Sequence, residues 1–140
     1  MSNVERVIAT IREGGMVIVT DDADREAEGD LVMAATHCTP QSMAFIIRNS
    51  CGIVCAPLSR TEAQRLHLTP MVSENDAPLG TAFTVSVDVA HDLTTGISAE
   101  QRSNTIRSLA NPNMGARDFV RPGHVFPLIA RDGGVLMRSG

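Results

Sequence analysis

Residues 16–35 read MVIVTDDADREAEGDLVMAA, which places six carboxylates and one arginine between two short apolar runs. The runs MVIVT (16–20) and LVMAA (31–35) predict two strands, so the acidic segment between them is expected to be a loop. Like charges at this density repel one another unless a cation or solvent compensates them. The candidates are therefore a metal site, a carboxylate acid–base site or a solvated surface turn.

Helix signals occur on both sides of this segment. Ser2, Thr39, Ser59 and Ser98 are each N-cap residues, so they predict four helices, of which the one after Ser59 is short and ends near Leu68. Gly14-Gly15 is expected to end the first helix, and Asn111-Pro112 the last.

Strand signals are interleaved with these helices. GIVCAPL (52–58) predicts a buried strand, and the alternation over 83–89 predicts a strand with one apolar and one solvated or polar face. Two further strands are expected over 121–130 and 133–137, around a Gly-Gly turn. The pattern predicts an α+β fold with a mixed β-sheet flanked by helices, in a single domain over residues 1–140.

The composition of the chain excludes several classes of function. With 43% hydrophobic residues and a net charge of -4, the chain lacks the basic face that nucleic acids or anionic membranes require. All 12 basic residues are Arg, which excludes lysine Schiff-base chemistry and a P-loop but leaves phosphate capture by Arg open. The three cysteines have no CxxC spacing and no signal-peptide-like run begins the chain, so we expect a cytoplasmic protein.

The acidic segment fits a hard divalent cation. Gly29 allows a sharp turn between Glu28 and Asp30, and Arg25 beside Glu26 offers one cation among the anions. Mg²⁺ or Mn²⁺ held by one or two carboxylates and water is the metal that this pattern favours.

Three other positions are candidates for a catalytic or binding role, and each also has a purely structural interpretation. His124 in RPGHVFP is either a general base presented by a rigid turn or a satisfied core or turn histidine. TTGIS (94–98) is either an anion-binding helix N-terminus or a plain N-cap. Cys55, on an apolar strand, is most often a buried small hydrophobe.

Five ordered motifs resemble one family along the whole chain. They are the acidic segment DDADREAEGDLVMAA, GIVCAPL, GTAFTVSVD, TTGISAEQR, and RPGHVFPL continuing to GGVLMRSG. This pattern resembles 3,4-dihydroxy-2-butanone 4-phosphate synthase. The resemblance implies a lyase of riboflavin biosynthesis that converts D-ribulose 5-phosphate to L-3,4-dihydroxy-2-butanone 4-phosphate and formate. It also implies Mg²⁺ or Mn²⁺ dependence, a homodimer and that family's α+β fold.

The resemblance also implies roles for individual residues. Glu26 matches the family's metal-binding glutamate, and His124 matches its essential catalytic histidine. The positions that match substrate-binding or pocket-lining residues are Arg25, Asp30, Cys55, Thr95, Arg138 and Gly140.

The end of the sequence departs from the family pattern. There, the Gly-Gly segment is followed by His-Thr-Glu, whose His is a second metal ligand, and by a later catalytic Glu, whereas this sequence has Ser139-Gly140 and stops. The resemblance therefore predicts a fold that is incomplete at the C-terminus, lacking the family's C-terminal part. Two functions remain open: the lyase, or an inactive fragment or degenerate relative that serves only as a sugar-phosphate-binding, metal-binding or oligomerisation module.

Overall fold

The larger of the two sheets in the described part of the chain is three-stranded and mixed. Its strands are β3 (Cys55–Leu58), β4 (Val87–Val89) and β5 (Phe119–Ile129), in the order β3-β5-β4. The central strand β5 runs parallel to β3 and antiparallel to β4, so the predicted mixed sheet is confirmed. The structure is a computed structural model that describes residues 1–21, 28–134 and 137.

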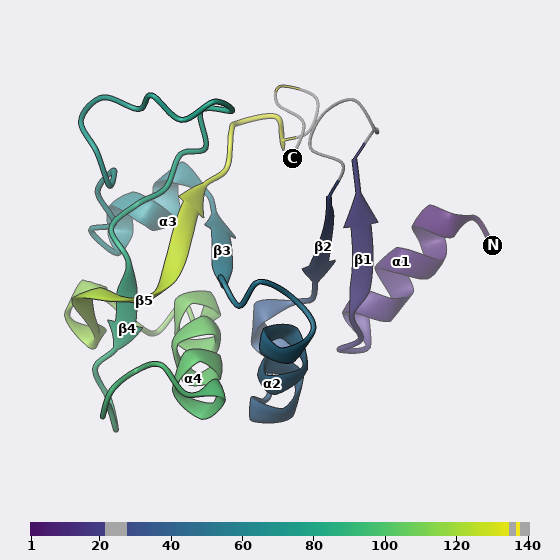
Figure 1. Ribbon diagram of the computed structural model, residues 1–140, viewed down its shortest axis with the longest axis horizontal. Coiled ribbons are helices and arrows are strands. Elements are labelled where there is room, and N and C mark those ends of the chain that lie inside the picture. The colour runs from purple at the N-terminus through teal and green to yellow at the C-terminus, as the bar shows by residue number, and fades with distance from the viewer. Residues whose placement is uncertain (22–27, 135–136, 138–140) are drawn as a thin grey trace.

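The acidic segment belongs to a separate antiparallel pair of strands. Strand β1 (Val17–Thr20) pairs with β2 (Gly29–Val32), which confirms a strand on each side of the acidic segment. Residues 22–27 of that segment lie outside the described part of the chain, and its last residue, Asp30, belongs to β2. The second strand starts two residues before the predicted run LVMAA and ends at Val32. Helix α1 (Asn3–Arg12) packs beside β1 at the end of the molecule farthest from the three-stranded sheet (Figure 1).

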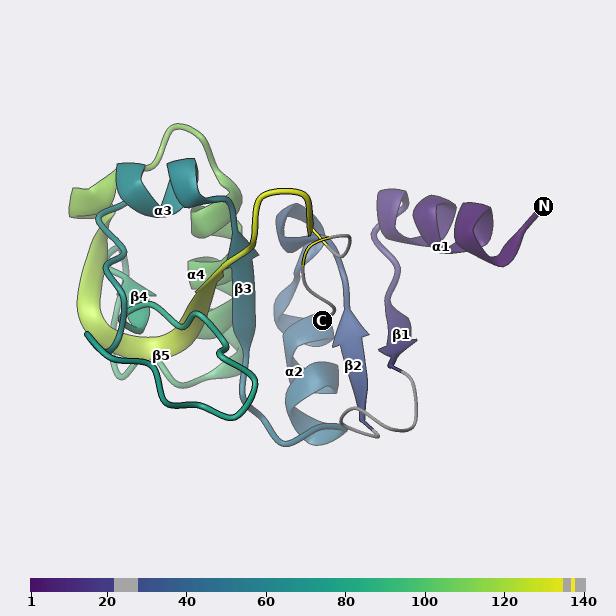
Figure 2. The same cartoon turned by 90° about the horizontal axis from the view of Figure 1, so that it is seen from above.

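The helices begin where their N-caps predict. The Ser2 side chain accepts a hydrogen bond from the Glu5 backbone N–H, and the Thr39 and Ser98 side chains make equivalent caps. The remaining helices are α2 (Pro40–Arg48), α3 (Arg60–Arg65), α4 (Ala99–Ala110) and the 3₁₀ turns η1 (Ala35–His37) and η2 (Ala116–Asp118). Helix α4 packs against both α2 and β4, and Figure 2 shows it beside the sheet.

The hydrophobic core lies between the three-stranded sheet and the helices α2, α3 and α4. It includes Met43 of α2, Leu66 after α3, Val87 of β4, Leu109 of α4 and Val125 of β5, all nearly inaccessible to solvent. No residue of α1 is buried. The core thus fixes the sheet that carries the candidate site and leaves α1 peripheral.

The strand predicted over 52–58 is shorter and less buried than expected, and no described residue of 133–137 belongs to a strand. Within 52–58 only Cys55–Leu58 form a strand, and their burial alternates instead of being complete. Within 133–137, Gly133, Gly134 and Met137 lie in turn conformations, and the other two residues lie outside the described part of the chain.

The strand expected over 83–89 is shorter, and its polar face is packed rather than solvated. Strand β4 covers Val87–Val89, whereas Thr84, Ser86 and Asp88 are at most 9% exposed. The cause is β5, whose Gly123 lies so close to β4 that a Cβ there would collide with the Val87 and Asp88 backbone. The Gly123 backbone N–H also donates to Ser86 Oγ at 3.1 Å.

Candidate active site

His124 is presented by an irregular part of strand β5. Val87 pairs with Val125, but the next residue, Asp88, pairs with Val120, so residues 121–124 bulge out of the ladder. Bulges of this kind redirect a side chain away from the regular face of a sheet. The His124 side chain is 40% exposed, which leaves part of the ring open to solvent.

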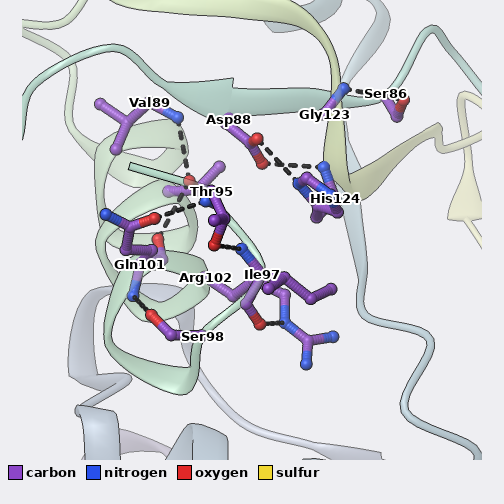
Figure 3. A network of polar contacts seen from close by, with 12 residues as sticks. Ser86, Asp88, Val89, Thr95, Ile97, Ser98, Gln101, Arg102, Gly123 and His124 are labelled. Atoms are coloured by element: carbon purple, nitrogen blue, oxygen red, sulfur yellow. Dashed lines mark hydrogen bonds and ion pairs between the residues drawn. The ribbon is translucent and has the colours of Figure 1, made fainter. Parts of the chain in front are cut away.

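Asp88 holds this histidine by two hydrogen bonds. The His124 backbone N–H donates to Asp88 Oδ1 at 2.8 Å, and the ring atom Nδ1 lies 2.9 Å from Asp88 Oδ2 (Figure 3). Asp88 is only 3% exposed. A buried carboxylate that accepts from Nδ1–H fixes the ring orientation and leaves Nε2 as the proton acceptor.

The loop that leads into α4 covers the pair from the other side. Gly96 has a φ of +87°, and a Cβ there would lie 2.6 Å from Asp88 Cγ and 2.9 Å from His124 Nδ1. Only a residue without a side chain can approach this closely. Thr95, immediately before it, is exposed, and its Oγ1 lies 3.5 Å from the Ile97 backbone nitrogen. The sequence-predicted residues Thr95 and His124 are therefore brought to one place.

Cys55 and Asp30 form a second part of the site. Cys55 pairs with Phe126, two residues along β5 from His124, and its side chain is exposed, which corrects the expectation of a buried hydrophobe. Partial burial raises the pKa of the Cys55 thiol, and the neighbouring charges of Asp30 and Cys51 raise it further. Asp30 is an exposed residue of β2, and its effect on this pKa connects it with Cys55.

Four predicted site residues lie outside the described part of the chain. They are Arg25, Glu26, Arg138 and Gly140. Among the residues that the structure does describe, no three His, Cys, Asp or Glu side chains lie close enough together to hold a metal ion. The metal prediction therefore depends on Glu26 and its neighbours in the acidic segment.

Asp88 is the functional residue that sequence reasoning missed. It was assigned to a solvated or polar strand face together with Thr84 and Ser86, although it is the one charged residue of the stretch TAFTVSVDVA. A carboxylate among β-branched residues requires a partner if its strand is buried. That signal was present in the sequence, but the partner His124 is 36 residues away.

The fold and this pair define a class of α+β protein with a histidine at a strand bulge supported by a buried carboxylate. A family model described as 3,4-dihydroxy-2-butanone 4-phosphate synthase matches residues 5–140. The chain therefore belongs to the 3,4-dihydroxy-2-butanone 4-phosphate synthase family, as the motifs predicted.

Similar proteins support this assignment. The chain is 53% identical to the bifunctional riboflavin biosynthesis protein RIBA 1 of Arabidopsis thaliana, across 99% of this chain and 26% of that protein. It is 51% identical to the riboflavin biosynthesis protein RibBA of Rhodococcus erythropolis, across 99% of this chain and 32% of that protein. The chain thus spans about a quarter to a third of these curated relatives.

Solved structures of the family share the fold. A 3,4-dihydroxy-2-butanone 4-phosphate synthase in complex with two magnesium ions aligns with a TM-score of 0.97 at 47% identity, covering all of this chain and 65% of that one. RibBX from A. baumannii, a two-domain synthase, aligns with a TM-score of 0.93 at 45% identity, covering 99% of this chain and 41% of that one. These matches confirm the predicted fold class.

No helix in the described ranges of the chain has both the length and the apolar character needed to cross a membrane.

Proposed function

We propose that the protein is a lyase that converts D-ribulose 5-phosphate to L-3,4-dihydroxy-2-butanone 4-phosphate and formate in riboflavin biosynthesis. The observation that carries this proposal is the His124–Asp88 pair beneath the Thr95–Gly96 loop. The reaction begins by removing a proton from a carbon next to a carbonyl, which requires a positioned base. A partly exposed imidazole whose Nδ1 is engaged by a buried carboxylate is suited to this step.

His124 acts as the base through Nε2. Its Nδ1–H donates to Asp88 Oδ2, so the ring stays in the tautomer that accepts a proton at Nε2. When the ring takes the substrate proton, the charge of the imidazolium is compensated by Asp88, which is only 3% exposed. Because Asp88 also accepts from the His124 backbone N–H, ring and main chain are held together.

The remaining predicted residues bind the substrate. The Thr95 hydroxyl, the Asp30 carboxylate and the Cys55 thiol are exposed polar groups on three different segments of the chain. They suit the hydroxyl groups of a pentulose. Arg25, Arg138 and Gly140 complete the set, and the planar guanidinium of Arg138 is suited to bidentate binding of the phosphate.

We assign Glu26 as the protein ligand of a Mg²⁺ or Mn²⁺ ion. Supporting this, the carboxylate-rich segment supplies the hard oxygen donors that these ions prefer. When bound, the ion would polarise the substrate carbonyl and stabilise the negative charge that develops there. A solved relative is a complex with two magnesium ions, which supports a divalent cation as the cofactor.

We further propose that the protein acts as a homodimer in the cytoplasm, without nucleic-acid or membrane partners. The net charge of -4 and the exposed apolar side chains of α1 and β1 support this.

A formate assay on the protein tests the proposed function. With ribulose 5-phosphate and Mg²⁺ or Mn²⁺ we expect one formate and one four-carbon phosphate per substrate consumed. Exhaustive chelation should abolish release, and either ion should restore it. Absence of formate under these conditions, or release that chelation does not diminish, would overturn the proposal.

A further inference from the structure

Arg102 is a buried cation on α4 that the proposed chemistry does not use. Its residue is 7% exposed, and it lies beside the loop that covers His124 (Figure 3). Burial lowers the pKa of its guanidinium below the usual arginine value, and the nearby Asp88 carboxylate opposes part of this shift. Burying a guanidinium is costly unless it is compensated by charge and hydrogen bonds, so its contacts require an explanation.

The guanidinium connects two segments that are far apart in the sequence. Its Nε donates to the Ile97 carbonyl at 2.9 Å, and one terminal nitrogen donates to the Gly52 carbonyl at 2.8 Å. Ile97 follows Thr95 and Gly96 in the loop over the site, whereas Gly52 lies in the turn before Cys55. One planar group therefore bridges the segments that carry two predicted substrate contacts.

The preceding residue, Gln101, makes a different kind of contact. Its Oε1 accepts from the Gly96 backbone N–H, and its Nε2 donates to the Asp92 carbonyl at 3.0 Å. These bonds hold the loop to its own helix. The Arg102 bonds go further, because they tie the same loop across to the β3 side of the site.

We propose that Arg102 is a positioning residue whose two hydrogen bonds set the separation between Thr95 and Cys55 in the substrate site. This role rests on the proposed lyase function. Asp88 orients His124 through its own hydrogen bonds, so Arg102 acts on how the substrate is held and not on the base itself. Loss of its geometry should therefore raise KM more than it lowers kcat.

Arg102→Lys separates geometry from charge. Lysine keeps the positive charge near Asp88 but replaces the planar fork by one ammonium group, which cannot reproduce both bonds. In the full-length protein we expect KM for ribulose 5-phosphate to rise about ten-fold and kcat to stay within about three-fold. The matched control is Arg107→Lys, on the same helix, whose guanidinium bonds to the Cys38 carbonyl and Asn104 Oδ1. It should leave both constants unchanged.

Hydrogen exchange tests the bridge independently of activity. In Arg102→Lys, peptides covering 50–55 and 95–98 should exchange faster than in wild type, whereas Arg107→Lys should not change them. If wild type releases formate but Arg102→Lys has normal KM and normal exchange, this inference is wrong and the lyase function stands. If wild type releases no formate, the lyase function and the catalytic role of Arg102 are both wrong, and the exchange result decides only whether the bridge exists.

Discussion

At the residue scale, the proposed chemistry depends on a histidine whose backbone and ring N–H groups both donate to one buried carboxylate. Asp88 accepts from both the backbone and the ring of His124, so displacing either residue disturbs the other. The pair is closed on one side by Gly96, while the His124 side chain remains 40% exposed. This leaves one nitrogen of the ring available for a substrate.

The environment of Cys55 predicts a thiol that reacts slowly with alkylating reagents. Because burial, Asp30 and Cys51 raise its pKa, its thiolate fraction at neutral pH lies below that of an ordinary cysteine. The rate of alkylation of Cys55 by iodoacetamide should therefore increase only when the pH rises above the usual pKa range of a cysteine. Asp30→Asn removes one negative charge, lowers that pKa and should accelerate alkylation at fixed pH roughly two-fold.

Peptide mass spectrometry measures alkylation at Cys55 separately from Cys51. Glu28→Gln is the control, because it removes a carboxylate that does not act on Cys55. An equal rate in Asp30→Asn and wild type would show that Asp30 does not influence the thiol.

The acidic segment permits a sharper test of the metal assignment. Glu26→Gln keeps the size of the side chain but removes an anionic oxygen ligand, so calorimetry should show Mg²⁺ affinity at least about ten-fold weaker. Glu28, which is exposed, serves as the matched control, and Glu28→Gln should change the affinity by less than about three-fold. Equal losses in the two variants would contradict a single metal-binding glutamate.

At the element scale, the loop between β4 and α4 brings the site together. It is held to α4 by the Ser98 cap and Gln101, and α4 is held to β4 because Thr105 Oγ1 accepts from the Val89 N–H at 2.9 Å. The loop therefore inherits its position from the helix and the strand. Its closeness to the His124–Asp88 pair leaves no room for a side chain at Gly96.

Gly96→Ala should damage both stability and activity. An alanine there suffers an unfavourable φ of +87° and a collision with Asp88 and His124. Gly80→Ala is the control, because Gly80 also has a positive φ, +62°, but nothing lies within 4 Å of its Cβ position. Thermal unfolding should show a loss of about 1 kcal/mol for Gly80→Ala and at least about 3 kcal/mol for Gly96→Ala. Similar losses would mean that the close approach contributes nothing.

The sequence predicted the helix starts well and the strand pairing poorly, for a physical reason. Helix starts at Ser2, Thr39 and Ser98 were predictable because a cap is a contact between residues three apart. The bulge at 121–124 and the burial of Asp88 depend on which strands pair, and a period-2 pattern does not contain that information. His124 and Thr95 were therefore found by motif, whereas Asp88 and Arg102 required the structure.

At the scale of the whole molecule, apolar side chains remain exposed on α1 and β1. Val4 is 68% exposed and Ile8 50% on α1, and Ile18 of β1 is 70% exposed. The two elements pack beside each other, and exposed apolar side chains on neighbouring elements are typical of a surface that another chain covers. The proposed homodimer supplies such a chain.

Sedimentation velocity of the full-length protein should show a dimer at micromolar concentration. Ile18→Ser should shift the equilibrium toward monomer, because burial of an isoleucine side chain contributes about 1.5–3 kcal/mol. Met71→Ser, at a 44% exposed position in the 70–80 loop, should leave the dimer intact. A monomeric wild type, or equal weakening by both variants, would contradict an interface formed by α1 and β1.

Single-turnover formate release by wild type, Asp88→Asn and His124→Asn tests the central claim, that His124 is the base and Asp88 orients it. All three should bind ribulose 5-phosphate and metal alike, because neither residue is assigned to binding. We expect His124→Asn to lose about 10²–10⁴ in rate, and Asp88→Asn to lose at least about ten-fold, since the wrong tautomer becomes accessible. A His124→Asn variant that remains folded and releases formate within about ten-fold of the wild-type rate would contradict the account.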